Sequence, residues 1–339
     1  MAQEYKSRLV ALDPSVNYLM TLYLHPSITP DVVREAKKAG IVGIKSYPAG
    51  VTTNSASGVL DYEMFYPVFE AMQEEGLVLN LHGECPSDQK EITILNAESK
   101  FLPTLKSLNE RFPRLKIVLE HCTTADAVKT VEACGPTVVG TITAHHLFLI
   151  IDDWAGDVFC YCKPVAKLPI DRNALLNAVV RSKGKFFLGT DSAPHPLEAK
   201  KGLKSNTAAG VFTQPYCVPY VLTALEDAVK RGDIEEEAIT QELLEGFLGG
   251  YGRKFYGIES TNEKIRVSKG NEVIVDSIKG DGLEVVPFRN AKMLCYQGLT
   301  IACDPLLMSN SEMLVLVEFG SLLGFLILLI VIMGIQGSQ

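Results

Sequence analysis

Short apolar runs alternate with longer amphipathic, charged segments along most of this chain, and no other feature limits its fold as strongly. This alternation is typical of the strands and helices that build a parallel α/β sheet. Strands are predicted at residues 17–24, 41–46, 77–82, 116–121, 137–143 and 186–191. Helices are predicted in the segments between them, so the fold class is α/β.

Capping residues mark the ends of several predicted helices. Thr29, Pro30 and Asp31 are typical of a helix start, and Gly40 and Gly76 each follow a helical segment as C-terminal glycines do. The repeated order of strand, helix, glycine and strand favours a (β/α)8 barrel of the TIM type. Only six strands are visible in the sequence, whereas a closed barrel has eight. We therefore expect a barrel that lacks its first two strands.

Composition narrows the class of protein. The chain has 339 residues, enough for one large barrel domain, and a formal net charge of −8 without a long basic run, which argues against a nucleic-acid partner. The eight cysteines are scattered, without zinc-knuckle or redox spacing, and are interpreted as reduced thiols. The first residues contain no apolar core of a secretory signal. These features predict a cytoplasmic protein.

Four polar residues stand at the ends of predicted strands, namely Lys45, His82, His121 and Asp191. Barrel enzymes place their chemistry at the carboxyl ends of their strands. A lone buried histidine is more often a hydrogen-bonded core residue, but four such residues together predict a metal site. Imidazole and carboxylate groups suit zinc, and a neutral lysine can add carbon dioxide to give a carbamate that bridges two metal ions. Asp191 could then bind one ion and transfer a proton.

Longer motifs around these residues resemble the dihydroorotases of the single-function type, which belong to the amidohydrolase superfamily of metal-dependent barrels. One of them is Gly-Thr-Asp-Ser-Ala-Pro-His at residues 189–195. The other matching segments are residues 45–55, 81–84, 120–124, 141–147, 161–164, 208–212, 255–257 and 285–288. Residues 1–290 are accordingly assigned to one incomplete barrel domain.

The resemblance implies a metal centre with two zinc ions. Lys45 would be modified to N6-carboxylysine and would bridge the two ions. His82 and His121 would bind the second ion. Asp191 would be a metal ligand and the catalytic general acid and base.

The resemblance also implies which residues hold the substrate. His195 and the main chain at Ala209 and Lys163 would contact it, and His82 would lie near it. Because Lys163 would act through its main chain, the identity of its side chain is a weak argument.

A segment rich in small and hydroxyl residues, 50–58, matches the mobile loop of the family. In that loop, Thr52 and Thr53 would close over the substrate and exclude water. The alternative is that this segment is a polar connection between a strand and a helix.

The reaction implied is the reversible, zinc-dependent hydrolysis of the cyclic amide of (S)-dihydroorotate to N-carbamoyl-L-aspartate, in the synthesis of pyrimidines. The partners implied are this small molecule and a second copy of the chain. Another cyclic-amide hydrolase, such as a dihydropyrimidinase or allantoinase, shares the Lys, His, His and Asp pattern and stays an alternative. So does a catalytically inactive remnant.

The sequence departs from the family pattern in one respect that matters for chemistry. The family has a His-x-His pair at the end of its first strand, followed by an arginine and later an asparagine. The six histidines of this chain include no such pair. We therefore expect the 339-residue chain alone to hold little zinc and to have negligible activity, with the missing segment encoded upstream of Met1. Of the other histidines, His146 is expected to be structural and His145 to be an ordinary surface or loop residue.

The last part of the chain follows the family only in part. A divergent linker is expected at residues 291–312. Residues 313–335 are almost entirely apolar apart from Glu318 and are long enough to cross a bilayer. They are either a membrane anchor, which would make a membrane a partner, or a tail foreign to the ancestral enzyme, which is the favoured interpretation.

Overall fold

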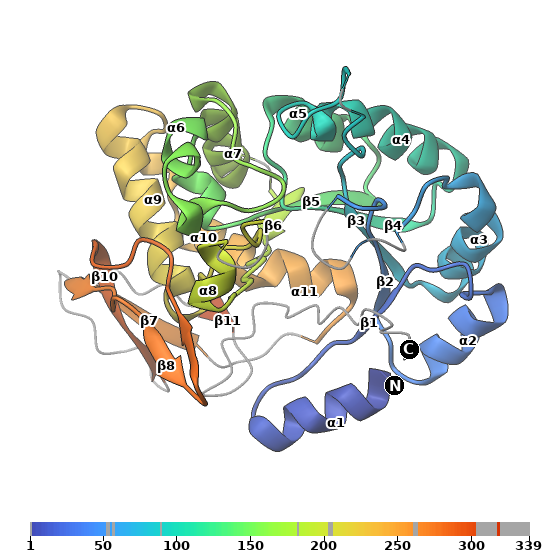
Figure 1. Ribbon diagram of the computed structural model, residues 1–339, viewed down its shortest axis with the longest axis horizontal. Helices are drawn as coiled ribbons and strands as arrows, with labels where there is room; N and C mark the ends of the chain where they lie inside the picture. The colour runs from blue at the N-terminus through green and yellow to red at the C-terminus, as the bar shows by residue number, and fades with distance from the viewer. Residues whose placement is uncertain are drawn as a thin grey trace.

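A six-stranded parallel sheet forms the centre of the protein (Figure 1). The computed structural model describes residues 2–51, 55, 58–88, 90–181, 183–202, 206–259, 264–302 and 317–318. The strands lie side by side in chain order and are β1 (Thr21–Tyr23), β2 (Gly43–Ser46), β3 (Val78–His82), β4 (Lys116–Glu120), β5 (Val138–Ile142) and β6 (Phe186–Leu188). All five neighbouring pairs are parallel. The alternating pattern therefore predicted this sheet correctly.

Most of the helices lie around the outside of the curved sheet (Figure 1). The longer ones are α1 (Ala2–Leu12), α2 (Pro30–Lys38), α3 (Tyr66–Glu75), α4 (Ala97–Arg111), α5 (Ala125–Ala133), α7 (Pro169–Arg181) and α9 (Cys217–Arg231). The shorter ones are α6 (Ile151–Ala155), α8 (Leu197–Lys200), α10 (Gln241–Glu245) and α11 (Tyr251–Tyr256). The predicted caps are present, since the Thr29 hydroxyl accepts a hydrogen bond from the Val32 N–H and Gly76 ends α3 with a φ of 67°.

The strands are buried because side chains pack on both faces of the sheet, as parallel sheets require. Every residue of β2, β3 and β5 is buried. One face packs against the helices through residues such as Leu79 and Leu119. The opposite face presents Val78, Val118 and Phe187 to aromatic side chains of α11. The inner face of the sheet is therefore covered by α11, a helix that lies far from these strands in the sequence.

The strand order begins at β1 and ends at β6, so the described residues form an open sheet instead of a closed barrel. The chain continues past β6 with a single parallel bridge between Ser192 and Val211. This bridge brings the segment after β6 back toward the carboxyl ends of the strands. The expected TIM-type barrel without two of its strands is consistent with this arrangement.

A second, smaller sheet follows the parallel one. Its strands are β7 (Lys264–Val273), β10 (Met293–Ala302) and β11 (Val317–Glu318), in the order β10-β7-β11, and β8 (Ile278–Gly280) pairs with β9 (Leu283–Val285) nearby. Residues 293–302, within the range expected to be a linker, thus form a strand that is antiparallel to β7.

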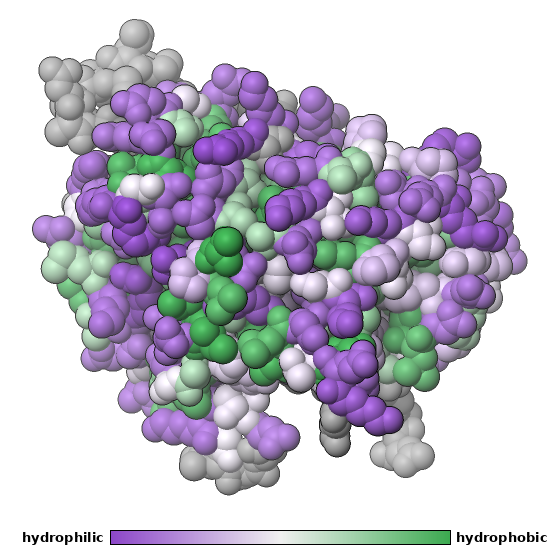
Figure 2. All heavy atoms as spheres, turned by 90° about the horizontal axis from the view of Figure 1, so that it is seen from above, coloured by the Kyte–Doolittle hydropathy of each residue, from purple (hydrophilic) through white to green (hydrophobic). Residues whose placement is uncertain are grey.

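The apolar segment 313–335 lies outside the described residues except for Val317 and Glu318, which pair with β7. Within the described part of the chain, no helix combines the length and apolarity that crossing a membrane requires. On the face seen from above, hydrophilic side chains predominate, and apolar side chains gather between them near its centre (Figure 2).

Candidate active site

A cavity of about 230 Å³ opens at the carboxyl ends of the strands and collects most of the predicted site residues. The cavity is lined by Lys45, Tyr47, His82, His121, Lys163, Asp191, Ala193, His195, Ala209 and Gly210. All four predicted metal ligands are among them, and so are four of the six predicted substrate-binding residues, His82 belonging to both sets. Thr52 and Thr53, the other two, lie outside the described residues.

The four predicted ligands come from four different strands or their ends. Lys45 is in β2 and His82 is the last residue of β3, whereas His121 directly follows β4 and Asp191 follows β6. His121 has a φ of 44° and Asp191 a φ of 42°, values in the left-handed region that cost energy for residues other than glycine. Two strained residues out of four therefore point to a site whose geometry is held by the surrounding structure.

The hydrogen bonds of the two histidines suit metal ligands. The ring centroids of His82 and His121 are 4.6 Å apart. His82 Nε2 lies 2.8 Å from Glu84 Oε2, so Glu84 orients the ring and leaves Nδ1 as the available atom. His121 Nδ1 is buried and has no hydrogen-bond partner among the described residues. Burial lowers the pKa of both rings, most strongly for His121, so both are neutral and hold a free lone pair.

Lys45 and Asp191 form the charged part of the cavity. Burial lowers the pKa of Lys45 to about 7, although the nearby Asp191 carboxylate acts in the opposite direction. Burial raises the pKa of Asp191 to about 6, against the effect of Lys45. The Lys45 ammonium donates a hydrogen bond to Glu120 and lies 4.7 Å from the centre of the Tyr47 ring. A neutral Lys45 amine is thus available near neutral pH.

The opposite wall of the cavity carries polar groups suited to hold a small molecule. His195 Nε2 donates to the Ala209 carbonyl oxygen at 3.0 Å, which leaves Nδ1 as the acceptor. Lys163 Nζ donates to the Val51 carbonyl oxygen at 2.7 Å. The Lys163 side chain also borders a second cavity of about 300 Å³ beside Glu84. The structure therefore gives this side chain contacts of its own, in addition to the main-chain role expected from the sequence.

Gly210 permits the close approach of the two segments that form this wall. A Cβ atom at this position would lie 2.7 Å from the Ala193 carbonyl oxygen and 2.8 Å from His195 Cδ2. Any larger residue would have to displace the imidazole or the main chain that it meets.

Sequence reasoning missed Glu84, Glu120 and Tyr47 as members of the site. Each lies inside a motif that was noticed, within two residues of a predicted ligand. The contacts of Glu120 depend on a neighbouring strand, because it pairs with His82 across β3 and β4 and accepts a hydrogen bond from Asn80 Nδ2 at 3.1 Å. The signal available in the sequence was the repeated placement of a carboxylate beside each histidine.

The structure corrects one expectation for the remaining histidines. His145 is fully buried, so its assignment as an ordinary surface or loop residue is wrong. It begins the 3-10 helix His145–Leu147, whose residues are all buried. His146 is also buried and bonds to Thr143 and to the Pro164 carbonyl oxygen.

The donor set fits a metal ion. Two neutral imidazoles, one of them with a buried unpartnered nitrogen, face the same cavity as a carboxylate and an amine. Imidazole and carboxylate ligands are those that zinc and related ions prefer. Without an ion, burial of the His121 nitrogen would cost free energy that no hydrogen bond offsets.

Comparison with known proteins identifies the family. The Amidohydrolase family profile matches residues 26–138. A protein of Schizosaccharomyces pombe described as a probable dihydroorotase is 50% identical over 293 residues, covering 86% of this chain and 82% of the relative. The dihydroorotase of Saccharomyces cerevisiae is 45% identical over 313 residues, covering 86% and 83%. The chain belongs to the dihydroorotase family of amidohydrolases.

Solved dihydroorotase structures share the arrangement. The crystal structure of the Saccharomyces cerevisiae dihydroorotase in complex with 5-fluoroorotic acid superposes with a TM-score of 0.81 at 43% identity, covering 88% of this chain and 85% of that one. An L-hydantoinase from Arthrobacter aurescens superposes with a TM-score of 0.68 at 17% identity, covering 85% and 69%, which shows a common fold. As an amidohydrolase of this family, the chain is a metal-dependent hydrolase.

Proposed function

We propose that this protein catalyses the reversible hydrolysis of (S)-dihydroorotate to N-carbamoyl-L-aspartate in pyrimidine synthesis. The observation that carries the proposal is the cavity that brings together Lys45, His82, His121 and Asp191. Relatives at 45–50% identity that bear the name dihydroorotase support the choice of substrate.

In the proposed metal centre, Lys45 as N6-carboxylysine, His82, His121 and Asp191 would hold the metal ions, which the family resemblance implies to be two zinc ions. Bound metal would supply an activated water and polarise the amide carbonyl of the ring. The lowered pKa of Lys45 supports the modification, because only the neutral amine can add carbon dioxide. The unpartnered His121 nitrogen supports its role as a ligand.

The residues of the chain would move one proton during hydrolysis. The water oxygen bonds to the ring carbonyl carbon, the carbon–nitrogen bond breaks, and Asp191 transfers the proton from the water to the departing nitrogen. A carboxylate can accept and then donate a proton, so Asp191 is suited to both halves of this transfer. His195 and Lys163, on the opposite wall, would orient the substrate. Ring closure uses the same steps in reverse.

One experiment separates this function from those of other cyclic-amide hydrolases. The protein, supplied with zinc and bicarbonate, is assayed for ring opening with dihydroorotate, dihydrouracil and allantoin. We expect turnover of dihydroorotate alone, and loss of that turnover on treatment with a chelator. Faster ring opening of dihydrouracil or allantoin would overturn the assignment.

A second candidate is a catalytically inactive protein that retains the dihydroorotase fold. It is favoured by one specific observation, that the 339 residues contain no His-x-His pair. If this second candidate holds, the 339-residue chain would bind well under two zinc ions and have negligible turnover. Wild-type-like turnover with two bound zinc ions per chain, measured by metal analysis and the same assay, would contradict this expectation.

The proposed setting is a homodimer in the cytoplasm. The seven cysteines among the described residues are all free, which supports a reducing compartment. Sedimentation equilibrium is expected to give twice the chain mass. A monomer at micromolar concentration would contradict the dimer.

A further inference from the structure

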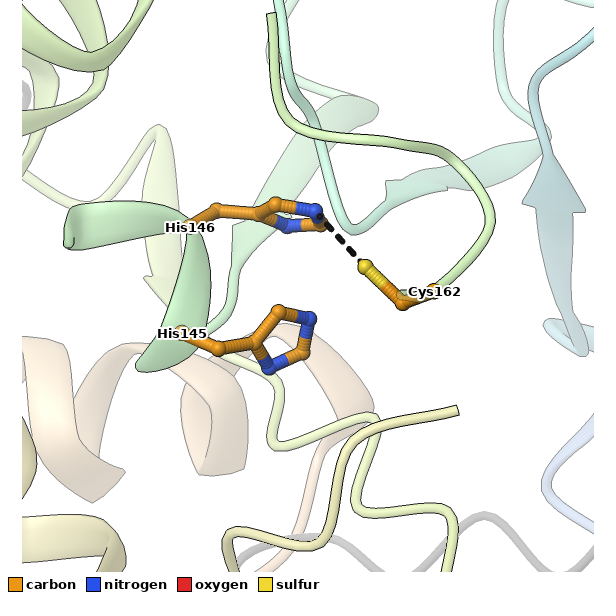
Figure 3. A group of neighbouring side chains, drawn as sticks. All are labelled: His145, His146 and Cys162. Atoms are coloured by element: carbon orange, nitrogen blue, oxygen red, sulfur yellow. Dashed lines mark hydrogen bonds between the residues drawn. The ribbon is translucent and has the colours of Figure 1, made fainter. Parts of the chain in front are cut away.

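A second group of potential ligands lies in the part of the chain that the structure describes, apart from the lining of the strand-end cavity. His145 and His146 begin the short helix after β5, and Cys162 lies in the segment after the 3-10 helix Val158–Cys160. Figure 3 shows the two imidazoles and the thiol turned toward a common space. Their ligand atoms all lie within 4.8 Å of one another. We call these three residues the His-His-Cys cluster.

His145 is the residue that calls for an explanation. It is fully buried, and neither Nδ1 nor Nε2 has a hydrogen-bond partner among the residues that the structure describes. Burying an imidazole without partners costs free energy, so buried polar groups are nearly always satisfied. Burial also lowers its pKa well below the ordinary range, which leaves a neutral ring with a free lone pair. A bound ion would satisfy this lone pair.

The other two members already have the spacing of zinc ligands. His146 Nε2 lies 3.5 Å from Cys162 Sγ. Two ligands on tetrahedral zinc are separated by roughly 3.3–3.6 Å, given zinc bonds of about 2.0–2.1 Å to nitrogen and about 2.3 Å to sulfur. The Pro164 carbonyl oxygen lies 3.1 Å from His146 Nε2 and 3.3 Å from Cys162 Sγ, so it occupies a similar position.

The hydrogen bond on the far side of His146 also suits a ligand. Thr143 Oγ1 lies 2.7 Å from His146 Nδ1. Metal-bound histidines commonly hold their second nitrogen in such a bond, which fixes the tautomer and the ring orientation. With the ring proton on Nδ1 and donated to Thr143, the Nε2 lone pair points to the side of Cys162.

We propose that His145, His146 and Cys162 form a structural binding site for a zinc-like transition-metal ion. Imidazole and thiolate ligands favour ions of this class. On binding, the Cys162 thiol loses its proton to solvent as the sulfur–metal bond forms, and the His146 ring proton moves from Nε2 to Nδ1. The Pro164 carbonyl oxygen is available as a fourth ligand.

The site would position one wall of the strand-end cavity. Cys162 directly precedes Lys163, whose ammonium donates to the Val51 carbonyl oxygen and lines that cavity. An ion that ties Cys162 to the helix after β5 would restrict the movement of this segment. The ion is therefore assigned a positioning role, separate from the proposed catalytic centre.

Cobalt(II) provides a test that does not depend on enzyme activity. A thiolate bound to cobalt gives a charge-transfer absorption in the near ultraviolet, and none of the proposed strand-end ligands is a thiol. The wild-type chain and Cys217→Ser, which alters another buried cysteine on α9, are expected to show this absorption. Cys162→Ser is expected to lose it, and His145→Gln to need at least tenfold more cobalt. Absence of the band from the wild type at saturating cobalt would overturn the proposal.

A second measurement covers the case in which Cys162→Ser does not fold. The wild-type chain is alkylated with iodoacetamide, with and without zinc, and the labelling rate of each cysteine is followed by mass spectrometry. Zinc is expected to slow labelling of Cys162 at least tenfold while leaving Cys217 unchanged. Equal rates at Cys162 with and without zinc would contradict a metal–sulfur bond.

Discussion

The two ends of the parallel sheet both carry charged side chains beside a cavity, yet they differ in how those side chains are satisfied. At the amino ends, a cavity of about 520 Å³ is bordered by four lysines. The Lys185 ammonium donates to the carbonyl oxygens of Cys134, Gly135 and Val138, and Lys116 donates to that of Phe255. At the carboxyl ends, His121 keeps a buried nitrogen without a partner.

The difference shows that charged side chains beside a cavity are weak evidence for a functional site. A buried ligand atom without a hydrogen-bond partner is stronger evidence. Lys116 and Lys185 at the amino ends bond to main-chain carbonyl oxygens and so hold neighbouring segments together. The residues at the carboxyl ends combine strained backbone, shifted pKa values and a free ligand atom. Substitutions at the carboxyl ends should therefore change chemistry, and those at the amino ends should change stability.

The largest effect is expected for Asp191→Asn. The amide cannot carry the proton that hydrolysis transfers, and loss of a general acid and base costs about 10²–10⁴-fold in rate. The measurement is kcat for dihydroorotate, relative to wild-type protein prepared and zinc-loaded beside it. Asp152→Asn, on the surface of α6, is the matched control and should leave kcat unchanged. A kcat within twofold of wild type in Asp191→Asn would remove the proton-transfer role.

Glu84→Gln should weaken the metal centre through His82. Glu84 orients the His82 ring by the 2.8 Å hydrogen bond to Nε2, and loss of such a partner typically costs about 10–100-fold in metal affinity or activity. Zinc affinity, measured by competition with a chromophoric chelator, is the direct readout. Glu63→Gln, at an exposed carboxylate, serves as the control. Unchanged affinity in Glu84→Gln would mean that His82 needs no such orientation.

Gly210→Ala should displace the substrate-binding wall without touching the metal ligands. The new methyl group would meet His195 Cδ2 and the Ala193 carbonyl oxygen, and a displacement of about 1 Å can cost on the order of 100-fold in rate. We expect a loss of about 10–100-fold in kcat/KM, with zinc content unchanged. Loss of zinc in this variant would show that the two walls of the cavity are not independent.

Lys185→Met should have the smallest effect on chemistry. Three carbonyl oxygens lose their donor, and we expect the free energy of unfolding to fall by about 1 kcal/mol, because the half-buried site admits water. Urea denaturation measures this change, and Lys254→Met, an exposed lysine at the same cavity, is the control. A large loss of kcat in Lys185→Met would contradict the claim that the amino ends of the strands affect stability and only the carboxyl ends affect chemistry.

The sequence predicted the parts of the structure that follow from local pattern. Apolar runs and helix caps marked the six parallel strands, and the ends of those strands marked Lys45, His82, His121 and Asp191. The antiparallel pairing of β7 with β10 was not predicted, because it joins segments about twenty residues apart whose strand character depends on mutual pairing.

The side-chain contacts of the site residues could not be predicted from the sequence either. Glu120 contacts Lys45 and Asn80 only because strand register places these three residues together. The burial of His145 depends on the segment around Cys162, sixteen residues farther along than His146. Such contacts are set by tertiary packing, which local periodicity does not encode.

The most direct test of the account is a crystal structure of the protein with zinc, measured at the zinc absorption edge. We predict an anomalous peak among Lys45, His82, His121 and Asp191, within about 2.0–2.1 Å of the His82 and His121 Nδ1 atoms. We also predict a carboxylated Lys45. A fully zinc-loaded crystal with no peak at this position would contradict the assignment of the carboxyl end of the sheet as the metal centre.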